Sequence, residues 1–136
     1  FWRLAIKPGR PVALGQINDT VFIGLPGNPV AAMVTFLQIA RPIILKLSGA
    51  NDTVPKLFSV QSDFSYKKKL NRREYVRVQI KKNGNGKLIA KKYKREGAGI
   101  LSSMVFADGF VELSEDIVDV QKGDFVNYIP FSELGL

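Results

Sequence analysis

A continuous apolar run that ends in a turn rich in glycine and proline most constrains the fold of this chain. Residues 20–25, Thr-Val-Phe-Ile-Gly-Leu, have the length and composition of a buried strand. Asn28 follows as a good helix N-cap, and Pro29 suits the first helical position, where its missing N–H costs nothing. The segment therefore predicts a strand, a tight turn and a helix start in an α/β arrangement.

The helix expected after this turn runs from Pro29 to Leu47. It is apolar on nearly every face, so we expect it to be well buried. Pro42 disfavours helical geometry at Arg41 and predicts a kink or a split there. The apolar stretch is also interrupted by Gln38 and Lys46, which argues against a membrane span, and no membrane partner is expected.

The remaining pattern predicts strands on both sides of this helix. Residues 1–7 and 12–17 are expected strands, with turns at 8–11 and at Asn18-Asp19. Residues 51–56 look like a linker, and after them the pattern changes to strands alone. The expected strands are residues 57–61, 74–82, 87–93, 105–113 and 125–130, with a hairpin turn at 83–86 and a short helical turn over 100–103. This second half predicts a small antiparallel barrel or sandwich.

Two residue types are missing, and their absence excludes several classes of function. The chain has no cysteine and no histidine. Disulfide scaffolds, metal sites built on Cys or His, and Ser-His or Cys-His catalysis are therefore excluded. The lack of cysteine fits a reducing compartment, and no signal peptide is evident, so we expect a cytoplasmic protein. The chain starts on Phe1 in what looks like the middle of a strand, so we expect it to be a piece of a longer protein.

The charge is uneven, with a net value of +8. Residues 66–95 hold thirteen Lys or Arg and one acid, Glu74. With Tyr66, Tyr75 and Tyr93 interleaved, this block could bind nucleic acid as single-strand-binding barrels do. We favour the alternative, in which the cations are solvated loops and outward strand faces. Residues 115–119 lack calcium-loop spacing, so we interpret their acids as an acidic turn and expect no metal ligand.

Two features could bind an anion. The first is the turn over residues 24–29, because a helix N-terminus presents unpaired N–H groups and glycines allow a ligand to approach. The second is the pair Arg3 and Lys7, which an extended strand would place on one face, roughly 13 Å apart. Spacing alone favours an ordinary strand-to-helix connection and two solvated cations.

Three blocks together are more specific than any one of them. They are residues 1–11, Phe-Trp-Arg-Leu-Ala-Ile-Lys-Pro-Gly-Arg-Pro; residues 24–30, Gly-Leu-Pro-Gly-Asn-Pro-Val; and residues 46–49, Lys-Leu-Ser-Gly. In sequence and spacing the chain resembles the molybdopterin molybdotransferase family, the MoeA type, which includes the E domain of gephyrin. The resemblance continues more weakly through 72–77 and 96–103. It implies α/β plus all-β architecture: residues 1–50 as the end of an α/β molybdopterin-binding domain, 51–56 as a linker and 57–136 as a C-terminal β-barrel domain.

The resemblance also implies a reaction. In that family molybdate is inserted into the dithiolene of adenylylated molybdopterin, which releases AMP. Magnesium assists, with ligands expected outside this chain. The implied partners are adenylylated molybdopterin, molybdate and the molybdopterin adenylyltransferase, and the full-length protein is expected to be a homodimer. Nucleic acid is not expected. The alternatives left open are a basic nucleic-acid-binding barrel and a protein-interaction module, as the gephyrin barrel serves in receptor anchoring.

The family's functional positions carry over residue by residue. Pro26, Pro29 and Lys7 match its catalytic positions. The substrate-binding matches are Arg3, where relatives often have Lys, with Gly27, Asn28, Arg77 and Ser102. Ala98 departs from the Ser common in relatives and is not assigned a role. The family's catalytic carboxylates would lie upstream of Phe1, so we expect the isolated chain to have no transferase activity.

Overall fold

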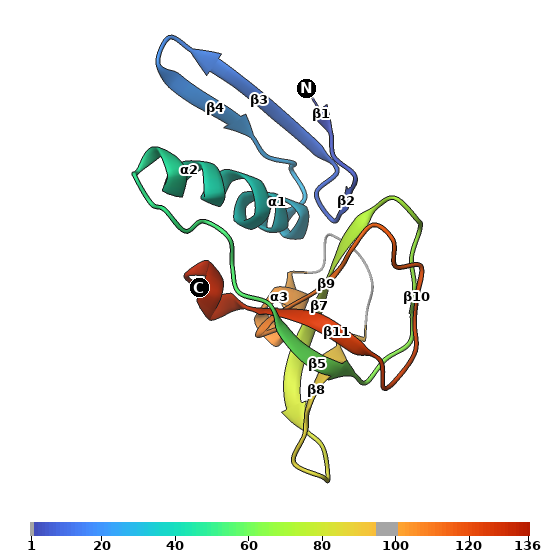
Figure 1. The fold of residues 1–136 in the computed structure, drawn as a ribbon. Coiled ribbons are helices and arrows are strands. Elements are labelled where there is room, and N and C mark those ends of the chain that lie inside the picture. The colour runs from blue at the N-terminus through green and yellow to red at the C-terminus, as the bar shows by residue number, and fades with distance from the viewer. Residues whose placement is uncertain (1, 95–100) are drawn as a thin grey trace.

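The N-terminal part of the chain is a small antiparallel sheet. The computed structural model describes residues 2–94 and 101–136. Strands β1 (Trp2–Arg3), β3 (Pro11–Ile17) and β4 (Thr20–Gly24) form a sheet in the order β1-β3-β4. β3 and β4 make the hairpin that stands away from the rest of the molecule in Figure 1, and Asn18 turns it with a φ of 52°. The predicted strand pair and its Asn-Asp turn are confirmed.

A helix follows β4, starting where the sequence predicts. It comprises α1 (Pro29–Thr35), a π-helical turn (Phe36–Ala40) and α2 (Arg41–Leu47). The α-helical geometry is split just before Pro42, as expected, by the π-helical turn, although Arg41 itself keeps helical angles, with φ −58° and ψ −50°. The N–H of Arg41 bonds to the carbonyl of Phe36, five residues back. This wider turn precedes Pro42, whose ring would clash with the carbonyl four residues before it in a regular α-helix.

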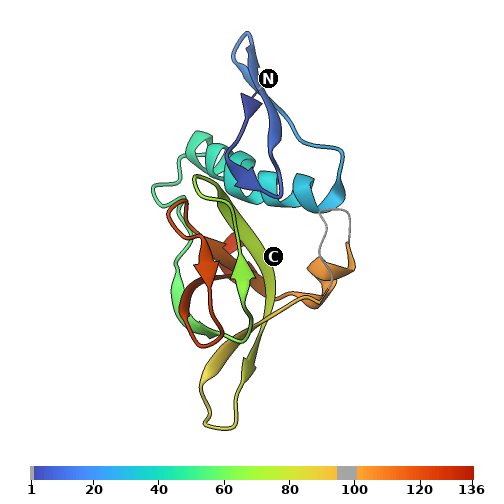
Figure 2. The ribbon, with the colours of Figure 1, turned by 90° about the vertical axis from the view of Figure 1, so that its right-hand side faces the viewer.

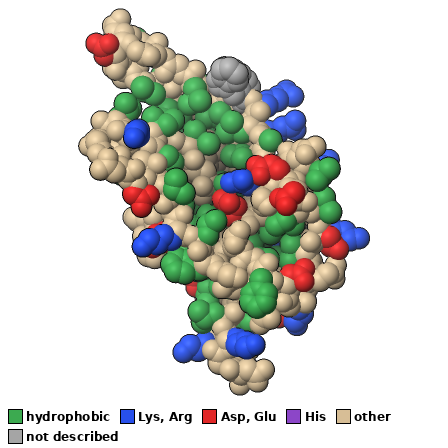
Figure 3. Space-filling view, viewed as in Figure 1, with side chains coloured by type: hydrophobic (Ala, Val, Ile, Leu, Met, Phe, Trp, Pro, Cys, Tyr) green, Lys and Arg blue, Asp and Glu red, His purple; other side chains and the backbone are tan. Residues whose placement is uncertain are grey.

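The helix is buried on one face only. Val30, Val34 and Leu37 are buried, but α2 contains no buried residue, so the expectation of a well-buried helix is wrong for its second half. Met33, Phe36, Ile44 and Leu47 are exposed; Figure 3 shows hydrophobic side chains gathered on the face between the hairpin and the helix. By length and composition alone this helix could cross a membrane, a test that core helices of globular proteins also pass.

The second half of the chain is a five-stranded barrel. Its strands are β5 (Phe58–Ser62), β7 (Arg73–Lys82), β8 (Leu88–Lys92), β9 (Gly109–Leu113) and β11 (Phe125–Pro130). They are hydrogen-bonded in the order β7-β8-β5-β11-β9, and pairing of β7 with β9 closes the ring (Figures 1 and 2). The predicted barrel and the β7–β8 hairpin are confirmed, but the expectation of a wholly antiparallel barrel is wrong, because β5 pairs with β8 in parallel. The sequence did not indicate the two-stranded pair of β6 (Tyr66–Lys67) and β10 (Asp119–Val120).

The predicted strand over residues 105–113 is wrong in its first half. Helix α3 (Ser102–Phe106) occupies this segment, and β9 begins only at Gly109. Ser103, Met104 and Ala107 are buried while Val105 is exposed, a helical spacing that a short apolar run conceals. A 3₁₀ turn, Phe131–Leu134, ends the chain and was not predicted. The helical turn expected over residues 100–103 falls in part on the start of α3, whereas the expected loop over residues 97–99 and residue 100 lie outside the described residues.

The predicted first strand is two strands in two sheets. The chain bends at Ala5, after which β2 (Ile6–Lys7) leaves the N-terminal sheet and pairs in parallel with β7 of the barrel. Ile6 lies opposite Arg73 and Lys7 opposite Glu74. Arg3 and Lys7 therefore do not share one face of a continuous strand.

Two hydrophobic clusters hold these parts together. One fills the barrel and includes Val76, Val78, Val111 and Leu113. The other lies between α1 and the outside of the barrel, where Val30 and Val34 share a cluster with Tyr75, Phe110 and Ile129. Successive residues of β7 therefore serve different clusters, as alternation along a strand requires. The second cluster fixes the start of the helix beside the barrel wall.

Candidate functional site

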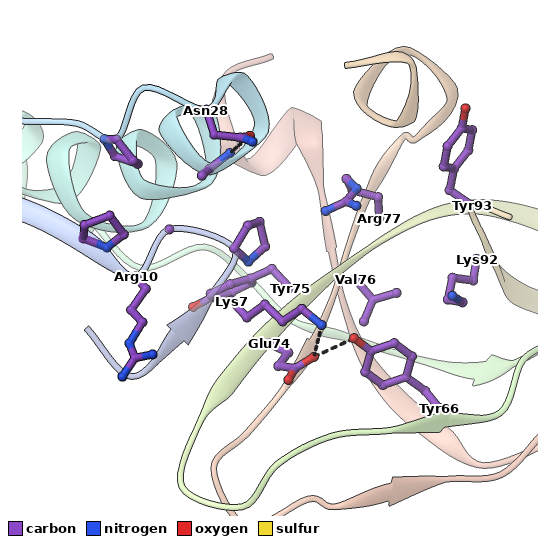
Figure 4. Close-up of a pocket in the computed structure, with 15 residues that line it drawn as sticks. Lys7, Arg10, Asn28, Tyr66, Glu74, Tyr75, Val76, Arg77, Lys92 and Tyr93 are labelled. Carbon is purple, nitrogen blue, oxygen red and sulfur yellow. Dashed lines mark hydrogen bonds and ion pairs between the residues drawn. The ribbon is translucent and has the colours of Figure 1, made fainter. Parts of the chain in front are cut away.

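A pocket of about 310 Å³ lies between the N-terminal part and the barrel wall (Figure 4). Three segments line it: the turn after β2, the start of α1, and the strands of the barrel. The lining residues are Lys7, Pro8, Gly9, Arg10, Pro11, Pro26, Asn28, Ala31, Tyr66, Glu74, Tyr75, Val76, Arg77, Lys92 and Tyr93. The pocket therefore joins the two halves of the sequence in one site.

Strand pairing explains why the hollow is there. β7 pairs with β2 at Arg73 and Glu74, and with β8 from Val78 onward. The stretch of β7 between those two partners, residues 75–77, lines the pocket. The pocket thus opens between β2 and β8, which both pair along the same edge of β7.

The turn over residues 7–11 is locked onto the helix. Gly9 has a φ of +108°, and a Cβ there would lie 2.4 Å from the Thr35 Oγ1 atom. The Thr35 hydroxyl, which is fully buried, donates to the carbonyl oxygen of Gly9 over 3.3 Å. The Lys7–Pro8 peptide bond is cis. Close packing of backbone against helix fixes the position from which Lys7 enters the pocket.

The start of the helix forms the facing wall. The Asn28 side chain accepts a hydrogen bond from the Ala31 N–H over 3.4 Å, and Pro29 occupies the first turn. A helix N-terminus carries a partial positive charge, which favours an anion. The two glycines of this segment differ. A Cβ on Gly27 would meet nothing within 4 Å, whereas one on Gly24 would lie 3.0 Å from the Ala13 Cβ and would crowd the packing between β3 and β4.

The described residues that line the pocket include several cations and one carboxylate. Lys7, Arg10, Arg77 and Lys92 line it together with Glu74. The Glu74 side chain is 1% exposed, and its Oε2 atom lies 3.9 Å from the Lys7 Nζ atom.

The negative charge of Glu74 is balanced by neighbouring donors from the second half of the chain. Arg72 pairs with it through Nε over 2.9 Å and through a second, shorter contact, and the Tyr66 hydroxyl donates to it over 2.6 Å. The remaining lining charge is positive, so the pocket favours an anionic ligand.

Aromatic rings complete the lining. Tyr75 is buried and packs its ring 5.9 Å from that of Phe110, and burial raises the pKa of its hydroxyl, so it stays neutral. The Lys92 Nζ atom lies 5.5 Å from the centre of the Tyr66 ring. The Tyr93 hydroxyl lies 2.8 Å from the Ser102 Oγ atom. Because Tyr75 faces the second cluster, it is not available to stack on bases as the nucleic-acid alternative supposed.

The structure gathers some of the predicted site residues and separates others. Lys7, Pro26, Asn28 and Arg77 all line the pocket. Gly27 and Pro29 flank Asn28 in the same turn. The Ser102 hydroxyl contacts the hydroxyl of Tyr93, which lines the pocket. Arg3 lines a second hollow instead.

Sequence reasoning missed Arg10, Glu74 and Lys92 as pocket residues. A signal existed for Glu74. It is the single acid among thirteen cations over residues 66–95, and it falls on the same face of the alternating strand as Val76 and Val78. Its inward position requires compensating donors, which are Arg72 and Tyr66.

The described residues offer no metal site. No group of three or more Asp or Glu side chains among them could hold an ion, and the pocket's Glu74 is already engaged. These residues do not fit magnesium, so no step of the chemistry is assigned to it.

Replacing the helix cap should loosen one wall of the site. In Asn28→Ala the Ala31 N–H loses its acceptor, and we expect a loss of about 1 kcal/mol in the free energy of unfolding. Urea denaturation of the chain measures it. Asn28→Asp, which keeps an acceptor, should remain close to the parent; an equal loss in both variants would contradict a capping role.

Comparison with known proteins places this geometry in a family. The profile described as "MoeA C-terminal region (domain IV)" matches residues 59–131, and the one described as "Probable molybdopterin binding domain" matches residues 1–46. The molybdopterin molybdenumtransferase of Haemophilus influenzae is 36% identical over 135 residues, which is 98% of this chain and 33% of that protein. The molybdenum cofactor synthesis protein cinnamon of Drosophila melanogaster is 35% identical over 82% of this chain and 18% of its own length.

Similar solved structures support the same family assignment. The molybdopterin biosynthesis MoeA protein of Pyrococcus horikoshii superposes with a TM-score of 0.74 at 25% identity, over 96% of this chain and 31% of that one. A molybdenum cofactor biosynthesis protein from Pyrococcus furiosus gives a TM-score of 0.73 at 26% identity, over 96% of this chain and 44% of its own. The chain spans about a third of the length of the H. influenzae relative. It therefore belongs to the MoeA family of molybdenum cofactor biosynthesis proteins and contains that family's C-terminal region.

Proposed function

We propose that this chain forms one wall of an active site that inserts molybdate into adenylylated molybdopterin with release of AMP. The observation that carries the proposal is the pocket between β2, α1 and β7, where Lys7, Arg77 and Lys92 line a space with one neutralised carboxylate among the described residues. Both molybdate and a phosphorylated pterin are anions, so this lining suits them. The relatives named molybdopterin molybdenumtransferase support the same reaction.

The residues of the wall have separable roles. Lys7 supplies a point charge whose position is set by Glu74 on one side and by the turn against Thr35 on the other. Arg77 supplies a planar fork that can hold two oxygens of one anion. Figure 4 shows these two side chains entering from different elements. Pro26 and Asn28, which both line the pocket, shape the start of the helix.

Other parts of the proposal rest on family membership alone. They are magnesium assistance with ligands outside this chain, a homodimer, delivery of the substrate by a molybdopterin adenylyltransferase, and a cytoplasmic location. The described residues supply no acid or base pair for the chemistry. The isolated chain is therefore proposed to lack transferase activity.

A chimera tests the proposed function. This chain would replace the matching C-terminal third of the H. influenzae relative, with which it is 36% identical. In cells that lack their own transferase, we expect the chimera to restore formation of active molybdenum cofactor, measured as activity of a molybdenum-dependent enzyme. A folded, stably expressed chimera without this activity would count against the proposal.

Within the chimera, Arg77→Ala should weaken anion binding. Loss of a charged hydrogen-bonding group facing the anion should raise the molybdate concentration needed for half-maximal cofactor formation by about tenfold or more. Arg77→Lys keeps the charge and loses the fork, so an intermediate effect is expected. An unchanged molybdate requirement in Arg77→Ala would remove this residue from the site.

A further inference from the structure

A second hollow of about 310 Å³ adjoins the first, and its lining is more strongly basic. It is lined by Arg3, Leu4, Ala5, Arg10, Lys69, Leu70, Asn71 and Arg72, which we call the basic pocket. Four of these eight side chains are cationic and none is acidic. Arg10 lines both hollows, but Figure 4 shows its guanidinium turned away from Lys7 and Arg77. We propose that the basic pocket is a second oxyanion site, separate from the first, that binds a phosphate group.

The charges of the basic pocket are poorly balanced by the protein. Arg72 is paired with the buried Glu74, but the side chains of Arg3, Arg10 and Lys69 make no ion pair or hydrogen bond with any residue of the described chain. Like charges held together repel one another, and a bound anion relieves that repulsion. Two arginine forks beside a lysine suit a tetrahedral oxyanion, which accepts several charged hydrogen bonds at once.

The walls of the basic pocket are fixed before any ligand arrives. The Leu4 N–H bonds to the Arg10 carbonyl over 2.7 Å, which ties the two N-terminal segments together. The Arg73 N–H bonds to the Ala5 carbonyl over 2.8 Å, which ties them to the barrel. Asn71 adopts a left-handed φ of 60° that turns the loop. Such preorganisation lowers the cost of binding.

The residues that line the basic pocket restrict the class of ligand that it can bind. The described residues that line the basic pocket include no aromatic ring and no carboxylate, whereas those of the first pocket include three tyrosines. No aromatic side chain among these residues is available to stack on a base, so we take the phosphate group itself as the recognised part. Phosphate binding in the basic pocket does not depend on molybdate chemistry in the first pocket.

The test is a titration of the chain with inorganic phosphate and, separately, with AMP, followed through backbone amide NMR signals at low salt. We expect saturable shifts at Leu4, Ala5 and Asn71 with both ligands and at similar affinity, because the phosphate group is what binds. Arg3→Ala and Lys69→Ala should each weaken the affinity about fivefold.

Two variants serve as controls. Lys82→Ala removes the same charge at the far end of β7, roughly 30 Å from Arg73 by strand rise, and should leave phosphate affinity unchanged. Lys7→Ala removes a cation that lines the first pocket and not the basic pocket, and it should leave the affinity measured from the Leu4, Ala5 and Asn71 signals unchanged. No saturable shift, an equal loss in Lys82→Ala, shifts that depend on Lys7 alone, or binding of AMP without phosphate would each overturn the proposal.

Discussion

Gly109→Ala should strongly destabilise the barrel. A Cβ at this position would lie 2.3 Å from the Tyr128 Cε2 atom and 2.4 Å from the Ile129 carbonyl oxygen. Neither neighbour can yield easily. Gly109 pairs with Val78 on one side and with Pro130 on the other, so its backbone is held from both edges.

The tyrosine is also held. Its hydroxyl donates to the Asp108 carboxylate over 2.8 Å, and that carboxylate accepts the Ile80 N–H over 3.0 Å. The ring is part of the barrel core. Overpacking against fixed atoms should therefore reduce the free energy of unfolding by about 3 kcal/mol or more.

Thermal unfolding of the chain measures this effect, with a fall in midpoint of roughly 10 °C for a domain of this size. Gly84→Ala is the matched control, because a Cβ there meets nothing within 4 Å. We expect it to change stability by less than about 0.5 kcal/mol. If Gly109→Ala were as stable as Gly84→Ala, this result would contradict the close approach of β9 and β11 at Gly109.

Lys7→Ala should produce the largest loss of activity. In the chimera, removal of the positioned charge that we propose contacts the anion should reduce cofactor formation by about 100-fold. Stability should change little, because the Lys7 side chain is 50% exposed and Glu74 keeps its bonds to Arg72 and Tyr66. The measurement is molybdenum-enzyme activity per amount of folded chimera.

Two comparisons separate a functional role of Lys7 from a structural one. Lys87→Ala, on the hairpin tip, removes an equal charge away from the pocket and should retain full activity. Lys7→Arg should recover part of the loss, since the charge is kept. Activity that falls only in proportion to the amount of folded protein would assign Lys7 a structural role.

Local signals predicted local structure well. The Asn28 cap, the Asn18 turn and the hairpin after β7 all depend on a few neighbouring residues, and the structure contains all three. The error at residues 105–108 arose because a four-residue apolar run fits either a strand or one helical turn. The π-helical turn before Pro42 was not predicted, because a proline inside a helix can be accommodated either by a kink or by a wider turn before it.

Long-range pairing could not be predicted in the same way. Nothing near Ile6 indicates that it will lie opposite Arg73 rather than continue the first sheet. The candidate site followed from the family resemblance at Lys7, Pro26, Asn28 and Arg77, which line one pocket. Arg10 and Glu74 were missed because their roles depend on which strand neighbours β7.

The pairing of β2 with β7 also affects the order in which the parts of the chain can fold. The ribosome makes Ile6 and Lys7 near the start of this chain, yet their partners Arg73 and Glu74 appear only after the whole helix has been made. Closing so long a loop is entropically costly, and the two residue pairs between β2 and β7 offset that cost only together with the hydrophobic cluster between α1 and the barrel. We therefore expect the pocket to be among the last parts of the molecule to form, after the hairpin and the helix have already folded.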